Sequence, residues 1–145
     1  MSLNEKNDFL RLEIVSLKEN MFSGKVKYVV LPGIDGELGI FPNHTPLITK
    51  IKPGTLKFEN SDSSKQELFF VAGGILEVQP SVVTVLADTA IRGEEIDEEN
   101  ALSAKNKAEE IMKNNTDKIS LATAQAELAI AVAELATLRK LRGKK

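Results

Sequence analysis

The chain has one histidine, and any histidine-based chemistry would have to rest on it. His44 lies in the segment Pro42-Asn43-His44-Thr45-Pro46, where two prolines constrain the backbone. A hydrolytic triad or a metal site needs further convergent side chains, and no nucleophile motif accompanies this histidine. The sequence therefore favours a structural or interface role for His44 over a catalytic one.

Three glycines recur at intervals of three residues, at Gly33, Gly36 and Gly39. A dinucleotide-binding fingerprint has a different spacing and opens a helix, whereas the Ile40-Phe41-Pro42 run that follows resists helix formation. Glycines in this pattern are typical of turns in a β-domain. Glu37 stands between two of them, and its carboxylate has two interpretations: a solvated surface group or a contact to a partner.

Charged residues gather at two places in the C-terminal half. The acidic cluster comprises Glu94, Glu95, Asp97, Glu98 and Glu99. Paired carboxylates can hold a divalent cation, but a linker followed by the first turn of a helix explains the cluster better, because negative charge there complements the helix dipole. We therefore predict no metal site. The basic end comprises Arg139, Lys140, Arg142, Lys144 and Lys145, which suits a helix C-terminus or an acidic partner surface.

The composition of the 145 residues excludes several classes of protein. The formal charge is −2, and it divides into about −2 for residues 1–91 and 0 for residues 92–145, so nucleic acid is not the expected partner. Cysteine is absent, which removes disulfides, cysteine-based metal sites and cysteine nucleophiles. Met1 to Asp8 is polar, and no run approaches the roughly 20 apolar residues of a membrane helix, so we expect no direct membrane insertion.

Residues 9–91 alternate between apolar and polar side chains with a period near two, as in Leu10-Arg11-Leu12-Glu13-Ile14. Glycine and proline pairs separate the short apolar runs at regular intervals, and Asn60 to Ser64 has the composition of a hairpin tip. This pattern predicts a β-sandwich or barrel over residues 1–91.

The period changes after a linker at residues 92–96, and residues 97–145 are predicted to be helical. Asp97 is a plausible N-cap, and Ala101, Ala104, Ala108 and Ile111 then share one face. Asn114-Asn115 breaks the pattern, and Thr116 or Asp117 can cap a second helix. In that second helix, leucines recur every seven residues at Leu121, Leu128 and Leu135, beside a stripe of alanines at Ala122, Ala126, Ala129, Ala133 and Ala136. The short break predicts an antiparallel hairpin, which is a candidate movable element because its alanine-rich faces bury little apolar area.

Several linked segments resemble the epsilon subunit of bacterial F-type ATP synthases. They are Met21-Phe22-Ser23-Gly24, the run from Gly36 to Leu47, Gly73-Gly74-Ile75-Leu76-Glu77-Val78, and the run from Val83 to Ala90. The resemblance covers nearly the whole chain, and the motifs occur in the same order and at matching spacing. It implies a fold of β plus α class: an N-terminal ten-stranded β-sandwich followed by a C-terminal antiparallel two-helix hairpin.

The resemblance also implies a function. In that family the sandwich binds the gamma subunit and the polar loops of the c-ring, and the subunit turns with the rotor without catalysing a reaction or carrying a cofactor. It works at the cytoplasmic face of the bacterial inner membrane as a peripheral component. The helical hairpin either folds against the sandwich or extends toward the alpha and beta subunits, where it opposes ATP hydrolysis. From the residues alone, an adaptor in another assembly or a small hydrolase remains an alternative.

Individual residues follow from this resemblance. The loop that faces the c-ring matches Gly36, Glu37, Leu38 and Gly39, and His44 is expected near the stalk interface. Some relatives bind ATP through an Ile/Leu-Asp-x-x-Arg-Ala motif. Here the matching positions are Asp97, Asn100 and Ala101, and the amide of Asn100 cannot supply the charged fork of an arginine, so we expect weak ATP binding or none.

The basic residues that relatives carry along the second helix are also missing, because Ile130 and Ala136 occupy two such positions. An inhibitory contact of the extended hairpin would therefore rest on Lys105 and Lys107 in the first helix and on Arg139, Lys140 and Arg142 at the basic end.

Overall fold

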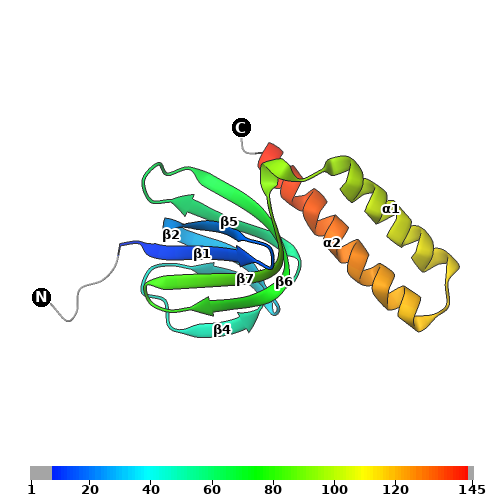
Figure 1. The fold of residues 1–145 in the computed structure, drawn as a ribbon, viewed down its shortest axis with the longest axis horizontal. Coiled ribbons are helices and arrows are strands. Elements are labelled where there is room, and N and C mark those ends of the chain that lie inside the picture. Colours follow the sequence, from blue (N-terminus) through cyan, green and yellow to red (C-terminus); the bar gives the residue numbers. More distant parts are fainter. Residues whose placement is uncertain (1–7, 144–145) are drawn as a thin grey trace, which may run out of the picture.

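The computed structural model describes residues 8–143, which form a β-domain followed by two helices (Figure 1). Lys144 and Lys145 of the basic end, and the first seven residues of the polar N-terminus, lie outside this range. The strands are β1 (Leu10–Ser16), β2 (Asn20–Gly33), β3 (Gly36–Ile40), β4 (Leu47–Lys50), β5 (Gly54–Asn60), β6 (Gln66–Val78) and β7 (Val82–Arg92). A short 3-10 turn, Gly93–Glu95, leads to α1 (Glu98–Asn114) and α2 (Lys118–Arg142).

The strands form a ring of neighbours around one hydrophobic core. The hydrogen-bonded order is β1-β7-β6-β5-β2-β3, and an additional pairing of β1 with β2 closes the ring, while β4 adds to β6. All described pairings are antiparallel except that of β1 with β7. The alternating apolar residues expected from the sequence supply the core: Leu10, Leu12 and Ile14 of β1 are at most 1% exposed.

A β-sandwich followed by two helices is the expected architecture, but the number of strands is seven instead of ten. The difference arises because three strands are long enough to serve both layers, with 14, 13 and 11 residues in β2, β6 and β7. The first half of β6 pairs with β5, and its second half pairs with β4. Gly73 and Gly74 lie between the two halves with φ values of 70° and 114°, which is the conformation that lets one continuous strand turn the corner.

The first helix begins after the predicted cap Asp97, and of the two candidates for the second cap, Thr116 and Asp117, the aspartate is the one used. The side chain of Asp97 accepts a hydrogen bond from the backbone N–H of Asn100, and that of Asp117 accepts one from Ser120, so each caps its helix. The hydrogen bonds from Ser120 lower the pKa of Asp117 and keep its carboxyl ionised. The three residues between the helices make the hairpin tight, as the break in the sequence pattern predicted.

Small residues make the contact between α1 and α2. The buried residues of the seam are Ala101 and Ala108 of α1 and Ala124 and Ala131 of α2. The leucines that recur every seven residues, by contrast, are only half-buried. The alanine stripe predicted for α2 is mostly exposed, and of its members only Ala133 is buried.

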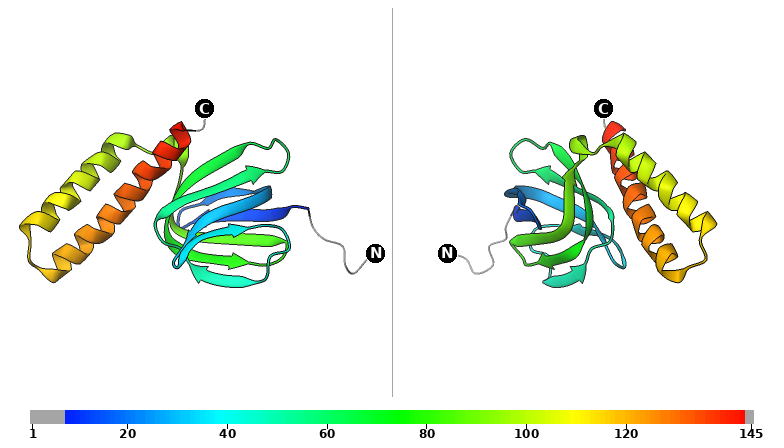
Figure 2. Two further views of the ribbon diagram at one scale, coloured as in Figure 1. Left: turned by 180° about the vertical axis from the view of Figure 1, so that it is seen from behind. Right: turned by 45° about the vertical axis from the view of Figure 1, so that its right-hand side comes forward.

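The C-terminal half of α2 joins the hairpin to the sandwich. A small cluster of Phe70, Ala72, Ile96, Ala133 and Leu138 forms this second core. Figure 2 shows that the helices approach the sandwich at the end where the chain terminates, while the tip of the hairpin projects away from it. By length and composition α2 is also apolar enough to cross a membrane, which the sequence analysis did not anticipate. It contacts α1, β5 and β6, while its apolar residues Ile119, Ile130 and Val132 remain exposed.

Candidate functional site

The turn between β2 and β3 carries the residues expected to meet a partner. Gly33 and Gly36 are paired across its neck, and Gly36 has a φ of 136°, a conformation that side chains with a Cβ rarely adopt. Ile34, Asp35 and Glu37 are exposed on this turn. The turn therefore presents one apolar side chain and two carboxylates from a constrained backbone.

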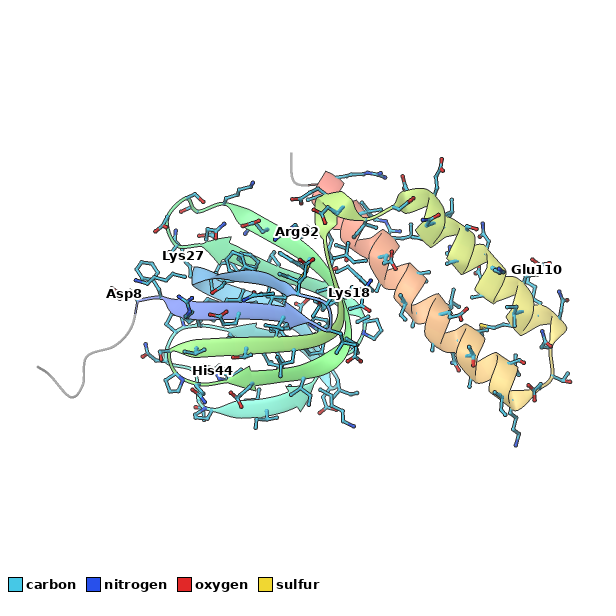
Figure 3. All side chains as sticks on the ribbon, in the orientation of Figure 1. Asp8, Lys18, Lys27, His44, Arg92 and Glu110 are labelled. Carbon is cyan, nitrogen blue, oxygen red and sulfur yellow. The ribbon has the colours of Figure 1, made fainter. Side chains whose placement is uncertain are left out.

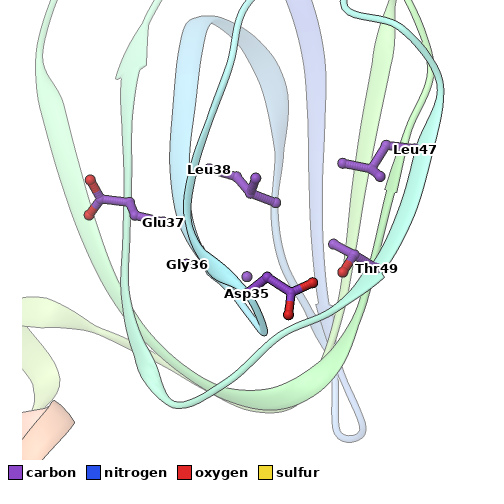
Figure 4. Close-up of a pocket in the computed structure, with 7 residues that line it drawn as sticks. Asp35, Gly36, Glu37, Leu38, Leu47 and Thr49 are labelled. Atoms are coloured by element: carbon purple, nitrogen blue, oxygen red, sulfur yellow. The ribbon is translucent and has the colours of Figure 1, made fainter.

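The side chains of Glu37 and Leu38 in β3 point in different directions, and both residues line a small pocket. Figure 4 shows Leu38 pointing toward Leu47 of β4 and Asp35 lying near Thr49, around a small pocket of about 180 Å³. Glu37 points the other way in the same view. The turn can therefore contact a partner with Glu37 while Leu38 holds it onto the sandwich.

Glu37 borders a second groove, of about 330 Å³, at the junction between the sandwich and the end of α2. The groove is lined by Val30, Glu37, Thr55, Lys57, Leu68, Lys140 and Gly143. The structure thus brings together Glu37 and Lys140, which the sequence analysis had assigned to separate roles. Their common groove could not be predicted because 103 positions separate them in the chain.

His44 lies away from this turn. Figure 3 shows it at the end of the sandwich that carries Asp8, whereas Lys18 lies at the end that faces the hairpin. The backbone N–H of its neighbour Asn43 donates to the carbonyl of Pro80, which fixes the segment against the turn between β6 and β7. The His44 ring is half-buried, and its Nδ1 lies 2.6 Å from the carbonyl oxygen of Thr45. His44 and Glu37 therefore belong to different surfaces.

The outer face of β6 and β7 exposes apolar side chains that the sequence analysis missed. Ile75 and Leu86 are direct cross-strand partners, and each is about half exposed, at 47% and 49%. Leu17, at 83% exposure, joins them at the edge of a shallow groove of about 480 Å³. We call Leu17, Ile75 and Leu86 the outer apolar patch. The glycine pair before Ile75 was the available clue, because the core-facing positions of β6 change from Phe69 and Val71 before this corner to Leu76 and Val78 after it.

The basic residues of the hairpin fall into two separate groups. Lys105 and Lys107 lie in the middle of α1, whereas Arg139, Lys140 and Arg142 occupy the last turn of α2. Because the helices are antiparallel and Glu98 bonds to Arg142, Lys105 is about 10 Å further along the hairpin axis than the basic end. The docked hairpin therefore presents no single basic surface made of all five residues.

The first turn of α1 carries one ion pair and one helix cap among the described residues. Asp97 uses its carboxylate as the helix cap, and Ala101 is buried against α2. Glu98 accepts two hydrogen bonds from the guanidinium of Arg142, at 2.8 and 2.9 Å. These bonds and the charge of Arg142 lower the pKa of Glu98. The residues present do not fit a phosphate group, because the exposed Asn100 follows the acidic residues Asp97, Glu98 and Glu99, and the guanidinium of Arg142 is already paired with Glu98.

Comparison with known proteins gives the same division of the chain. The family described as ATP synthase, Delta/Epsilon chain, matches with its beta-sandwich domain over residues 9–93 and with its long alpha-helix domain over residues 94–139. The ATP synthase epsilon chain of Delftia acidovorans is 56% identical over 136 residues, which cover 94% of this chain and 98% of the relative. That of Janthinobacterium sp. is 55% identical over 136 residues, covering 94% and 97%.

Solved structures have the same fold at low sequence identity. A chain in the mitochondrial ATP synthase of Euglena gracilis superimposes with a TM-score of 0.85 at 21% identity, over 95% of this chain and 86% of that one. A chain from the central stalk and c-ring of the Tetrahymena thermophila enzyme gives a TM-score of 0.57 at 14% identity, over 93% and 99%.

The sandwich with its appended hairpin and its exposed turn and patch define a protein built to contact other proteins. The similarity extends over both domains and nearly the full length of the relatives. The chain belongs to the ATP synthase delta/epsilon chain family, and its sequence groups it with the bacterial epsilon chains.

Proposed function

We propose that this chain is a non-catalytic subunit in the central stalk of a bacterial F-type ATP synthase, where it turns with the rotor and couples ion-driven rotation to ATP synthesis on other subunits. The observation that carries this proposal is the 56% identity to a bacterial epsilon chain over 98% of that relative's length. A match of this extent supports the role of a whole subunit, as opposed to that of a shared domain.

We assign the outer apolar patch to the gamma subunit. Leu17, Ile75 and Leu86 form an apolar surface on the rigid sandwich, and the face is rimmed by charged residues such as Asp88. Such a patch is costly to leave in water and is the usual centre of a protein interface. It remains available whichever position the hairpin adopts, because α2 covers a different part of β6.

We assign the turn between β2 and β3 to the polar loops of the c-ring. Asp35 and Glu37 give it negative charge, and Gly36 permits the tight turn that exposes them, so a basic loop of the ring is the complementary partner. His44, at the other end of β3, then belongs to a second part of the stalk interface. A subunit that binds the ring in this way is peripheral at the cytoplasmic face of the inner membrane.

The hairpin provides a regulatory element in this proposal. Its second core contains five buried residues, two of which are alanines, so release from the sandwich requires little apolar area to be exposed. When extended, it would reach the alpha and beta subunits through its lysines and its basic end. Domain boundaries at residues 1–91, 92–96 and 97–145 correspond to docking, linker and regulatory functions.

A pull-down with purified gamma subunit tests the assignment of the patch. Wild-type chain is expected to retain gamma, and Leu86→Asp is expected to weaken retention at least tenfold, because it puts a charge at the centre of the apolar patch. Leu102→Asp is the matched control, since Leu102 on α1 has almost the same exposure, 46% against 49%. If folded wild-type chain does not bind gamma, the adaptor in another assembly becomes the better explanation.

The c-ring assignment is tested by substituting Glu37→Lys in the assembled enzyme. We expect reduced proton pumping per ATP hydrolysed, with normal binding to gamma. Asp62→Lys makes the same charge change in the exposed tip between β5 and β6 and serves as the control. Normal pumping by the Glu37→Lys enzyme would exclude this role for Glu37.

A further inference from the structure

An ion pair that no sequence motif indicated joins the two helices at the end of the hairpin opposite its connecting loop. Glu98 lies in the first turn of α1, and Arg142 is the last residue of α2. The guanidinium donates from two nitrogens to the two carboxylate oxygens, at 2.8 and 2.9 Å, so the pair is bidentate. This planar two-bond arrangement is the strongest geometry available to an arginine and a carboxylate.

The position of this ion pair gives it control over separation of the helices. The three-residue loop after Asn114 joins the far ends of α1 and α2, and the Glu98–Arg142 pair joins the near ends. Between these two ties, the buried residues that face each other across the seam are mainly alanines, which contribute little apolar area. Separation of α2 from α1 therefore has to break the ion pair while the remaining seam offers little resistance.

The same turn of α1 is where the resemblance to other family members would put a nucleotide. In this chain the position of the arginine is taken by Asn100, and Asp97 is committed to capping α1. Arg142 brings a guanidinium to this turn from the last turn of α2, and Glu98 neutralises it.

We propose that the Glu98–Arg142 ion pair is an internal clasp that keeps the hairpin closed without a nucleotide, so that ionic strength and competing partner charges regulate opening. The proposal rests on the regulatory role proposed for the hairpin. It concerns the isolated subunit, and failure to bind gamma would leave its predictions unchanged. An acidic surface of a partner that competes for Arg142 would release the clasp and bind the freed basic end in the same step.

Amide hydrogen exchange followed by NMR on the whole chain tests the clasp. The amides of Ala124 and Ala131, which are buried in the seam, report rare opening of the hairpin, and that of Val85 in the sandwich core is the internal reference. Arg142→Gln and Glu98→Gln are each expected to speed exchange in the seam about threefold in low salt, the scale of an exposed but bidentate pair. Lys140→Gln, in the same turn and without an ion pair among the described residues, is expected to change nothing.

Two further measurements separate the clasp from a general effect of charge. The double variant is expected to exchange no faster than either single variant, because the loss of one partner already removes the pair. Raising NaCl from about 0.05 to 0.5 M is expected to remove the difference between wild type and Arg142→Gln, because screening weakens exposed pairs. Equal exchange in wild type and Arg142→Gln at low salt, or slowing of exchange by millimolar Mg-ATP, would overturn the proposal.

Discussion

Thr137 offers a direct measurement of how strongly the hairpin is docked. Its side chain is fully buried where α2 meets the sandwich, and its hydroxyl donates to the carbonyl of Ala133 at 2.9 Å. Because the hydroxyl proton of Thr137 is already donated to Ala133, the hydroxyl of Thr55 in β5 must be the donor in the 2.7 Å bond between the two threonines. This is a hydrogen bond between side chains of the two domains, and it joins residues 82 positions apart.

The substitution Thr137→Val keeps the shape of the side chain and removes both bonds. The bond to Thr55 contributes about 1 kcal/mol. The Ala133 carbonyl loses its bond to the hydroxyl but still accepts the helical backbone bond, so we expect a total cost of about 1–2 kcal/mol. Since 1.4 kcal/mol is about tenfold, the population of undocked hairpin should rise roughly five- to thirtyfold. Thr55→Val should cost about 1 kcal/mol, and the double variant should show a coupling of about 1 kcal/mol between the two sites.

Urea unfolding followed by two probes provides the assay. Circular dichroism at the helix band reports the hairpin, and the fluorescence of Tyr28, the one tyrosine of the chain, reports the sandwich. Thr123→Val, an exposed position on α2, is the control and should change stability by less than about 0.5 kcal/mol. A coupling energy below about 0.3 kcal/mol would refute the idea that this hydrogen bond ties the two domains together.

Three more outcomes follow from the packing and the charges. Leu138→Ala should destabilise the helix transition by about 2–4 kcal/mol and leave the tyrosine transition unchanged, because Leu138 is a large member of the small second core. Gly74→Ala should prevent the sandwich from folding, since a Cβ there would collide with the carbonyl oxygen of Leu86. Gly36→Ala, with nothing within 4 Å, should fold with a lowered urea midpoint because of its positive φ. Burial raises the pKa of Glu134 above its ordinary value of 4.5, so the folded state holds this proton more tightly than the unfolded state and the resulting stability is lost as pH rises through the raised value. Glu134→Gln should therefore stabilise the hairpin at pH 7 relative to wild type and have a smaller effect at pH 4, as measured by the urea midpoint; an equal effect at both values would contradict this.

Local patterns in the sequence were sufficient for the order and type of the elements. The alternation around Leu12 predicted strand β1, and the aspartates at positions 97 and 117 predicted where the helices begin, because capping depends on residues only three positions apart. The number of strands was wrong because whether a long apolar run continues through a corner depends on the backbone at Gly73 and Gly74. A glycine pair signals a turn and a bent strand equally well.

Contacts between distant parts of the chain could not be predicted from the sequence. The sequence predicted an alanine-rich seam, but the alanine stripe expected in α2, from Ala122 to Ala136, is mostly not the buried one, because the helices approach along Ala124 and Ala131. The choice between these faces depends on how closely two backbones can approach, which period alone does not contain. The outer apolar patch, likewise, becomes apparent only when the pairing of β6 with β7 puts Ile75 beside Leu86.

The parallel pairing of β1 with β7 has a consequence for synthesis of the protein. Arg11 of β1 pairs with Val82 of β7, so the first strand to be synthesised cannot form all its strand pairings until the last strand has left the ribosome. The two helices, by contrast, need only neighbours in sequence and can form within microseconds once they emerge. The platform for α2 on Phe70 and Thr55 is therefore ready only after about two thirds of the chain has been made. During synthesis, the edge of β1 that will pair with β7 stays unpaired until β7 emerges from the ribosome. An unpaired strand edge can pair with a wrong strand or bind a chaperone, so this interval carries the greatest risk of mispairing.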